Sequence, residues 1–171
     1  MAKRPEGGFT LVEMVAALTV LALLAAIVGP LLTNGARAYN DSASAVHTLS
    51  KLRVASERLV REIREIRRDG SGNFDISLPL SSSTLQFFKT DTEQVTIATA
   101  APLLTLAYAS IAGTPVLSDE VSTLSFGYFQ ADGSLSANDN TDVAFIEFEL
   151  ILTHAGNNYA QRSRIALRNR P

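Results

Sequence analysis

The position of Glu13 requires a chemical explanation, because this carboxylate lies inside a long apolar segment. From Phe9 to Leu32 the only polar side chains are those of Thr10, Glu13 and Thr19. On insertion scales, a carboxylate within a bilayer costs about 2.5–3.5 kcal/mol, and such residues usually have a function. Glu13 is therefore the first candidate functional residue of the sequence.

The segment around Glu13 is long enough to cross a membrane. Met14–Leu32 contains 19 residues with a single polar member. As a helix it would extend about 28 Å, close to the hydrocarbon thickness of about 30 Å. Lys3 and Arg4 precede it and predict a cytoplasmic N-terminus. We expect one membrane span followed by an exported body.

Two ordinary interpretations of this segment explain it incompletely. A secretory signal peptide fits the basic start and the small residues of Ala36-Arg37-Ala38. Signal cores, however, usually have about 7–15 apolar residues and contain no carboxylate. A plain membrane anchor explains every feature except Glu13.

The residues Gly7-Gly8-Phe9-Thr10-Leu11-Val12-Glu13 resemble the processing site of type IV pilin-like proteins. This family includes pilins, minor pilins and the pseudopilins of type II secretion. The resemblance implies that a prepilin peptidase cuts between Gly8 and Phe9 and methylates the new amine of Phe9. It also implies that Glu13 of one subunit meets the Phe9 amine of its neighbour during filament assembly.

The same resemblance implies partners and a location for the chain. Residues 1–8 would be the leader peptide, and residues 9–35 the transmembrane and assembly helix that contacts other pilins or pseudopilins. The chain would sit in the bacterial inner membrane with its N-terminus cytoplasmic and its body periplasmic, and would then enter a pilus or pseudopilus. Gly29 and Pro30 lie where family helices commonly bend, and the missing amide of Pro30 favours a kink or local melting there.

The next segment, residues 36–70, has the pattern of an amphipathic stem helix. Its apolar residues recur at spacings of three and four, which predicts one buried face. We expect this helix to end at Asp69-Gly70-Ser71-Gly72, where glycine permits a left-handed exit. The stripe consists of Val46, Leu49, Leu52, Ala55, Leu59, Ile63 and Ile66.

Residues 71–171 lose the helical period and favour strands. The clearest is 143–153, where Ile146, Phe148, Leu150 and Leu152 alternate with Glu147 and Glu149, and residues 154–158 then form a hairpin turn. We predict an α+β, pilin-like fold in which the long N-terminal helix packs on an antiparallel β-sheet. The predicted strands are 84–89, 94–99, 103–110, 121–130, 143–153 and 159–168.

One loop of the body is rich in oxygen ligands. Asp132, Asp139 and Asp142 are weak candidates for calcium binding. The loop departs from the EF-hand pattern, because Ala137 stands where glycine is required and Val143 where the bidentate glutamate belongs. A polar hairpin loop rich in turn residues is the simpler interpretation.

The charges are divided between a basic stem and an acidic body. Residues 70–161 contain one basic and ten acidic residues, and this negative charge opposes nucleic-acid binding. The stem arginines are expected to pair at i,i+4, as in Glu57 with Arg61 and Arg61 with Glu65, or to dock on the acidic body of another subunit. The four arginines of residues 162–170 would form an exposed strand face or an edge.

The sequence contains no cysteine, two histidines and no nucleophile or phosphate-binding motif, so we expect neither an enzyme nor a cofactor. The resemblance of the N-terminal segment, together with the length and the lack of cysteine, favours a minor pilin or minor pseudopilin. The chain is similar in outline to larger minor subunits, such as J-type pseudopilins and those of mannose-sensitive-haemagglutinin pili. Two alternatives stay open: a monomeric, membrane-tethered periplasmic binding module, and a DNA-binding minor pilin for transformation.

Overall fold

The computed structural model describes Gly8 and residues 10–167, and the chain divides into two compact units, residues 1–44 and 45–171. Helix α1 (Leu11–Arg64) begins in the first unit and ends in the second. Within the first unit, every described side chain up to Ala43 is exposed. The first unit therefore has no core of its own among these residues.

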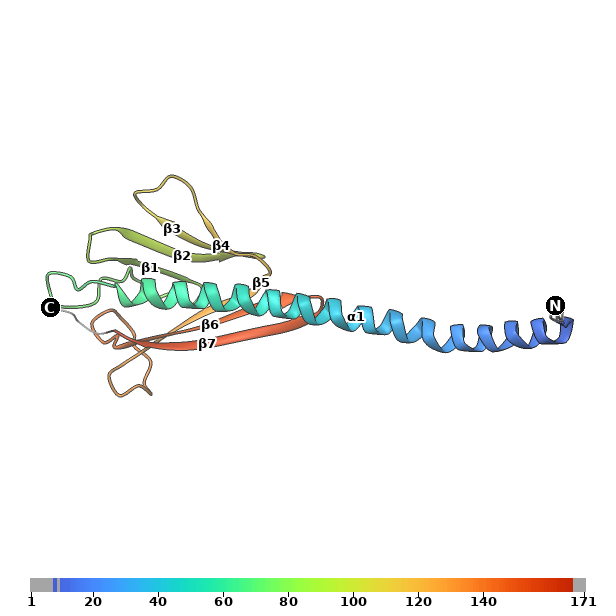
Figure 1. The fold of residues 1–171 in the computed structure, drawn as a ribbon. Coiled ribbons are helices and arrows are strands. Elements are labelled where there is room, and N and C mark those ends of the chain that lie inside the picture. The colour runs from blue at the N-terminus through green and yellow to red at the C-terminus, as the bar shows by residue number, and fades with distance from the viewer. Residues whose placement is uncertain (1–7, 9, 168–171) are drawn as a thin grey trace, which may run out of the picture. The chain divides into compact units, whose positions relative to one another are not determined.

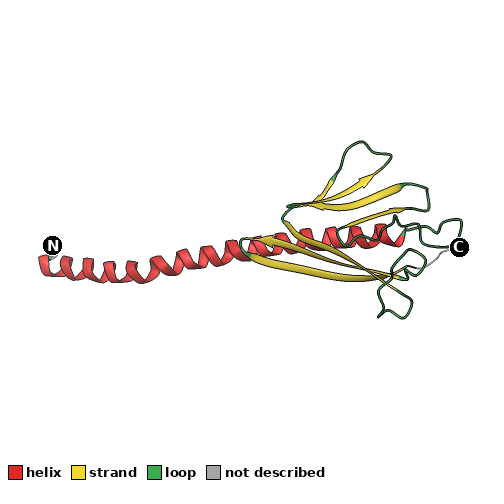
Figure 2. Cartoon of the chain, turned by 180° about the vertical axis from the view of Figure 1, so that it is seen from behind, coloured by secondary structure: helices red, strands yellow, loops and turns green. Residues whose placement is uncertain are grey.

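The second unit combines the end of α1 with two antiparallel sheets (Figures 1 and 2). The first sheet has the order β1-β2-β3-β4 and the second the order β5-β6-β7. This arrangement confirms the predicted α+β, pilin-like class, with two sheets in place of the single sheet expected. The strands are β1 (Thr84–Phe88), β2 (Gln94–Ala100), β3 (Leu103–Tyr108), β4 (Val116–Ser118), β5 (Val121–Phe129), β6 (Phe145–His154) and β7 (Asn157–Ala166).

The two sheets are joined through the segment that precedes β1. The amide of Phe126 in β5 donates to the carbonyl of Ser82 over 2.8 Å, and the hydroxyl of Tyr128 donates to the carbonyl of Ser81 over 2.8 Å. These bonds satisfy backbone groups at the junction, where no regular strand pairing continues. A serine-rich connection thus links two sheets that the sequence pattern merges into one.

One hydrophobic core lies between the helix and the sheets. On α1, Leu52, Ala55, Leu59 and Ile63 are at most 3% exposed. The inward-facing residues of β6 are fully buried while Glu147 and Glu149 lie on the opposite face, as predicted. Burying each large apolar side chain contributes about 1.5–3 kcal/mol. The core therefore belongs entirely to the second unit.

Helix α1 ends at Arg64, five residues before the predicted stop that begins at Asp69. After Arg64 the chain becomes extended: Ile66 forms a β-bridge with Lys89, and the amide of Arg67 donates to the carbonyl of Phe88 over 3.0 Å. Pairing with the end of β1 satisfies these backbone groups better than another helical turn would. Tertiary pairing thus overrides the helical propensity of these residues.

The apolar stripe was predicted correctly from Leu52 onward and wrongly before it. Val46 and Leu49 are 67% and 49% exposed, whereas Thr48 is 1% exposed. Val46 precedes Thr48, which is the first buried residue of α1, and Leu49 follows Thr48 on a side of the helix that stays about half exposed.

The predicted strands are all present, with bounds that differ by at most two residues. Strand β4 was missed, because its three residues are too few to show an alternating pattern. The last hairpin turns through Ala155 and Gly156, with φ of 49° and 79°, and His154 pairs with Asn157. Two successive positive φ values define the tight turn that suits the twist of a hairpin. The proposed end of the last strand at Arg168 lies outside the described residues.

Candidate functional site: the N-terminal helix and its charged residues

The start of α1 is where the sequence places the processing site. Gly8 is exposed, and the helix begins at Leu11. Residues 1–7 and Phe9 lie outside the described residues, so the leader and the cleavage and methylation at Phe9 stay predictions. An accessible glycine just before a helix is compatible with the approach of a peptidase.

Thr10 and Glu13 form a reciprocal cap at the start of α1. The amide and the hydroxyl of Thr10 each donate to Oε2 of Glu13 over 3.4 Å, and the amide of Glu13 donates to the hydroxyl of Thr10 over 3.3 Å. This is the capping box, in which two amides that lack helical partners are satisfied by side chains. The carboxylate also lies in the first turn, where the helix dipole favours negative charge.

The capping role of Glu13 was missed in the sequence, although its signal is present there. A threonine followed three residues later by a glutamate, just before an apolar run, is typical of a helix start. The capping box gives Glu13 an intrachain hydrogen-bond partner, Thr10, through bonds that are long at 3.4 Å. It leaves Oε1 of Glu13 without a hydrogen bond among the described residues, so this oxygen is open to a cation from outside the chain.

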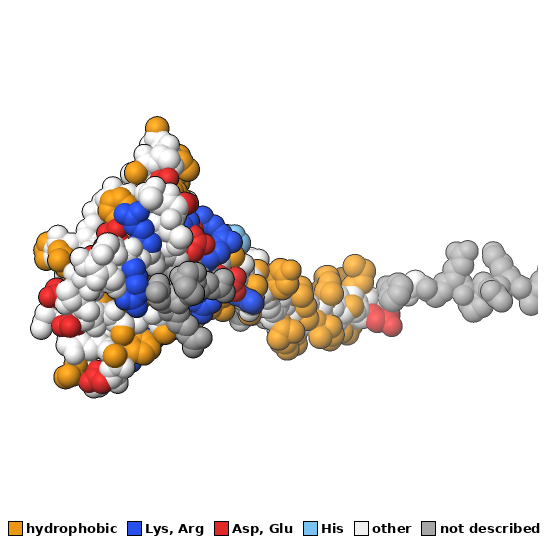
Figure 3. Space-filling view, turned by 90° about the vertical axis from the view of Figure 1, so that its left-hand side faces the viewer, with side chains coloured by type: hydrophobic (Ala, Val, Ile, Leu, Met, Phe, Trp, Pro, Cys, Tyr) orange, Lys and Arg blue, Asp and Glu red, His pale blue; other side chains and the backbone are white. Residues whose placement is uncertain are grey.

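The helix that follows is apolar on all sides. Between Leu11 and Leu32 every large hydrophobic side chain is at least 45% exposed, from Val28 at 45% to Leu11 at 81%. Figure 3 shows hydrophobic side chains around this part of α1. Among the described residues, α1 is the helix that is long and apolar enough to cross a membrane. An all-round apolar surface requires lipid or neighbouring helices to cover it.

The helix continues through Gly29 and Pro30, so local melting is not observed there. The kink at these residues stays a prediction. The hydroxyl of Thr33 donates to the carbonyls of Gly29 and Pro30 over 3.1 and 3.0 Å. Such bonds from threonine to the preceding turn satisfy carbonyls that an interrupted ladder leaves weakly paired, and they often accompany bending.

The aspartates of the loop at residues 132–142 serve the loop itself. Asp132 accepts bonds from the amides of Ser134 and Leu135, which lower the pKa of its carboxyl group. Asp139 likewise accepts bonds from the hydroxyl and the amide of Thr141, which lower its pKa. Within the described part of the chain, no three acidic or histidine side chains come together as a metal site, so Asp132, Asp139 and Asp142 do not form one ligand set.

A buried charged cluster fixes the end of α1 to the first sheet. Glu62 is 1% exposed, and its Oε1 accepts a hydrogen bond from the hydroxyl of Tyr108 over 2.9 Å and forms an ion pair with Arg58 over 2.8 Å. The ammonium of Lys89 lies 3.3 Å from Oε2 of Glu62 and 2.6 Å from Glu65. Burial alone would lower the pKa of Lys89, but the two carboxylates outweigh it and raise that pKa. Glu62 therefore acts as a structural anion.

A second charged cluster lies on the outer face of the second sheet. Glu147 of β6 accepts bonds from Arg162, through its Nε over 2.8 Å, and from Arg164 over 2.9 Å. Burial alone would raise the pKa of Glu147, but the two arginines hold it below its usual range. The expected exposed arginine face of the last strand is therefore confirmed for Arg162 and Arg164. Arg168 and Arg170 lie outside the described residues.

Comparison with known proteins identifies the N-terminal segment. Residues 3–29 match the family model described as the prokaryotic N-terminal methylation motif. No curated protein matches the chain. The motif supports a type IV pilin-like prepilin that is anchored in a membrane by one apolar helix and processed by a prepilin peptidase. The matched residues include Gly8, Glu13 and Gly29.

Proposed function

We propose that this chain is a minor pilin or minor pseudopilin, a structural and assembly-directing subunit of a type IV pilus or type II secretion pseudopilus. The observation that supports this most is the methylation motif at residues 3–29, which coincides with the start of an exposed apolar helix. Glu13 is the only charged residue of the helix between Leu11 and Ala36. A structural subunit also agrees with a chain whose charged clusters bind its own elements together.

In this proposal, cleavage after Gly8 exposes the amine of Phe9, which keeps its positive charge when methylated. The amine of one subunit then meets Glu13 of a neighbour inside the bundle of apolar helices. Two opposite charges about 4 Å apart attract by about 4 kcal/mol at an effective dielectric constant of 20. This attraction offsets the cost of placing each charge in an apolar environment and fixes the register between subunits.

The capping box makes it possible to separate the charge of Glu13 from its local role. Glu13→Gln keeps an oxygen that can accept the bond from the amide of Thr10 but removes the charge. Thr10→Ala removes the two bonds of the hydroxyl but keeps the charge of Glu13. We expect Glu13→Gln to reduce incorporation into filaments by more than about tenfold, since 1.4 kcal/mol already corresponds to a factor of ten. Thr10→Ala should have the smaller effect.

The test measures processing and assembly in cells that make the filament. Intact mass and N-terminal sequencing of the membrane-derived chain should show a mature protein beginning at methylated Phe9, and replacement of Gly8 by valine should abolish this processing. Glu13→Gln should stay in the membrane and be absent from sheared filaments, whereas the control Thr19→Ala should assemble normally. A membrane-tethered binding module would tolerate both the replacement of Gly8 and Glu13→Gln. A chain that begins at Met1 or at Tyr39 in the working complex contradicts the proposal.

A further inference from the structure

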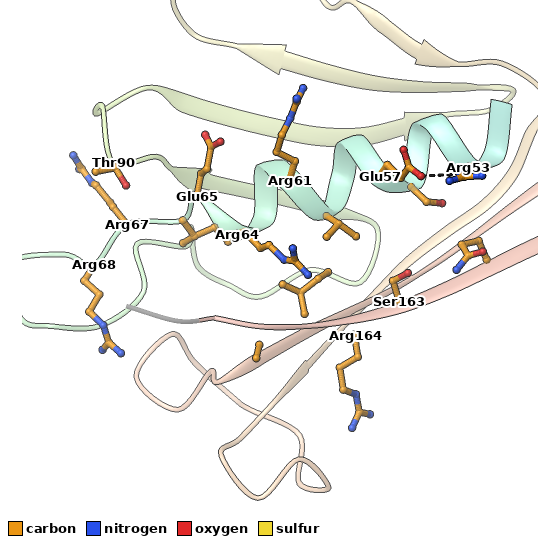
Figure 4. Close-up of a pocket in the computed structure, with 16 residues that line it drawn as sticks. Arg53, Glu57, Arg61, Arg64, Glu65, Arg67, Arg68, Thr90, Ser163 and Arg164 are labelled. Atoms are coloured by element: carbon orange, nitrogen blue, oxygen red, sulfur yellow. Dashed lines mark hydrogen bonds and ion pairs between the residues drawn. The ribbon is translucent and has the colours of Figure 1, made fainter. Parts of the chain in front are cut away.

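A groove rich in arginine lies between the end of α1 and β7 (Figure 4). It has a volume of about 1440 Å³, and both of its walls belong to the second unit. We name it the arginine groove. Its lining contains two acidic residues, Glu57 and Glu65, and six arginines, which are Arg53, Arg61, Arg64, Arg67, Arg68 and Arg164.

Two of these arginines have neither an ion pair nor a hydrogen bond among the described residues, whereas Arg68, which also lacks an anionic partner, donates to the carbonyl of Gly72. Most of the others are held by the chain itself, as Arg53 is by Glu57 over 2.8 Å. Arg61 and Arg64, one helical turn apart on α1, form no ion pair or hydrogen bond with any described residue. Figure 4 shows Arg64 extending from the helix toward β7. The guanidinium groups of Arg61 and Arg64 can therefore bind an anionic ligand.

The opposite wall is an open strand edge. β7 pairs with β6 along one side, and no described strand pairs with its other side. The groove-facing positions Gln161 and Ser163 are polar, although they pair with the fully buried Leu150 and Phe148 of β6. An unpaired edge presents a row of backbone donors and acceptors that can bind an extended chain.

A buried hydroxyl on the helix also lacks a partner. Ser56 is 6% exposed and lines the groove, yet its Oγ has no hydrogen-bond partner among the described residues. A buried hydroxyl without a hydrogen-bond partner lowers the stability of the fold. A polar ligand in the groove would remove this cost. The helix wall therefore provides a second, independent indication of a ligand.

We propose that the arginine groove binds an extended acidic segment of another protein subunit, which adds to the free edge of β7 as a further strand. Backbone bonds to β7 would supply the pairing. Because alternate side chains of a strand point to the same face, acidic residues at every second position would meet Arg61 and Arg64. The undescribed ends of this chain do not suit the role, since residues 168–171 carry two arginines and residues 1–7 carry a net positive charge.

The groove favours a peptide over a single-stranded nucleic acid. No aromatic side chain of the described residues lines it, whereas nucleic-acid grooves commonly use aromatic residues to stack the bases. Glu57 and Glu65 would repel a continuous phosphate backbone. An acidic peptide can place its few carboxylates at the arginines and its backbone at the strand edge. The inference concerns residues 45–167 alone, so it does not depend on processing at Gly8.

The experiment uses the full chain in detergent micelles and a fluorescein-labelled peptide of ten residues in which threonine and glutamate alternate. Fluorescence anisotropy at low salt should show binding that weakens by at least about tenfold when glutamine replaces glutamate in the peptide. Arg64→Gln and Arg61→Gln should each weaken binding by about fivefold. The control Arg37→Gln, which removes one exposed charge outside the groove, should change it by less than about twofold.

Hydrogen exchange locates the bound peptide. Amides of residues 157–166 should exchange more slowly when the peptide is added, because their free edge becomes paired. The proposal is overturned if the acidic peptide does not bind, if Arg37→Gln weakens binding as much as Arg64→Gln does, or if β7 gains no protection. Tighter binding of a ten-nucleotide thymidine oligomer than of the peptide would also overturn it, in favour of a nucleic-acid groove.

Discussion

Replacing Glu62 by glutamine tests whether the buried charged cluster stabilises the second unit. The substitution preserves the volume of the side chain, so it removes charge without creating a cavity. Arg58 and Lys89 would lose an anion that is 2.8 and 3.3 Å away. The hydroxyl of Tyr108 could still donate to the amide oxygen that replaces the carboxylate.

The magnitude follows from the burial of the partners. Removing one member of a fully buried ion pair costs about 3–5 kcal/mol. Here the side chains of Arg58 and Lys89 keep 33% and 15% exposure, and Lys89 keeps Glu65 at 2.6 Å. Both cations are thus partly compensated by water or by a second carboxylate. We expect Glu62→Gln to lower the free energy of unfolding by about 2 kcal/mol.

Thermal unfolding of the full chain in micelles, followed by near-ultraviolet circular dichroism of tyrosine and phenylalanine, measures this effect. A loss of about 2 kcal/mol should lower the Tm by about 8 °C for a unit of this size. The matched control is Glu57→Gln, because Glu57 and its partner Arg53 are 64% and 80% exposed. The control should change stability by less than about 0.5 kcal/mol. Equal Tm values for the two variants would refute the structural role of Glu62.

Two further substitutions examine the second sheet. The pKa of Glu147 is depressed by Arg162 and Arg164, so its stabilisation is present above the unfolded-state pKa of about 4.3 and is lost as the pH falls through the folded-state pKa. Glu147→Gln should therefore cost about 1 kcal/mol at pH 7 and progressively less as the pH falls through the folded-state pKa of Glu147, and a cost independent of pH would contradict this cause. Phe148→Ala should lower the free energy of unfolding by about 3–5 kcal/mol, because it leaves a cavity in the core. The control Ile146→Val should lower it by about 1 kcal/mol. If denaturant titrations gave the two variants the same loss, the core would tolerate the cavity.

The features predicted best from the sequence depend on residues that are close in the chain. The apolar helix, the carboxylate at Glu13 and the alternation of residues 146–152 are local patterns, because a helix or a strand face is defined within a few residues. The capping of Thr10 by Glu13 is equally local and could have been predicted.

The features that were missed depend on contacts between distant residues. Both Glu57 and Glu65 have the spacing to pair with Arg61, yet Glu57 binds Arg53 and Glu65 binds Lys89. Spacing along a helix permits a pair but does not choose between two possible partners. The choice is made by the end of β1, which brings Lys89 to α1. The division of the strands into two sheets likewise depends on Tyr128 meeting Ser81, 47 positions away.

The order in which the core is completed determines how long the nascent chain exposes apolar surface to chaperones and proteases. The apolar face of α1, from Leu52 to Ile63, is made before any of the strands that cover it. The core that buries this face includes Ile165 of β7, so translation must proceed at least that far before the core is complete. Until then this face is an exposed apolar surface that chaperones can bind and proteases can cleave. Chains that stop early would keep this surface uncovered and be degraded, whereas finished chains would conceal it.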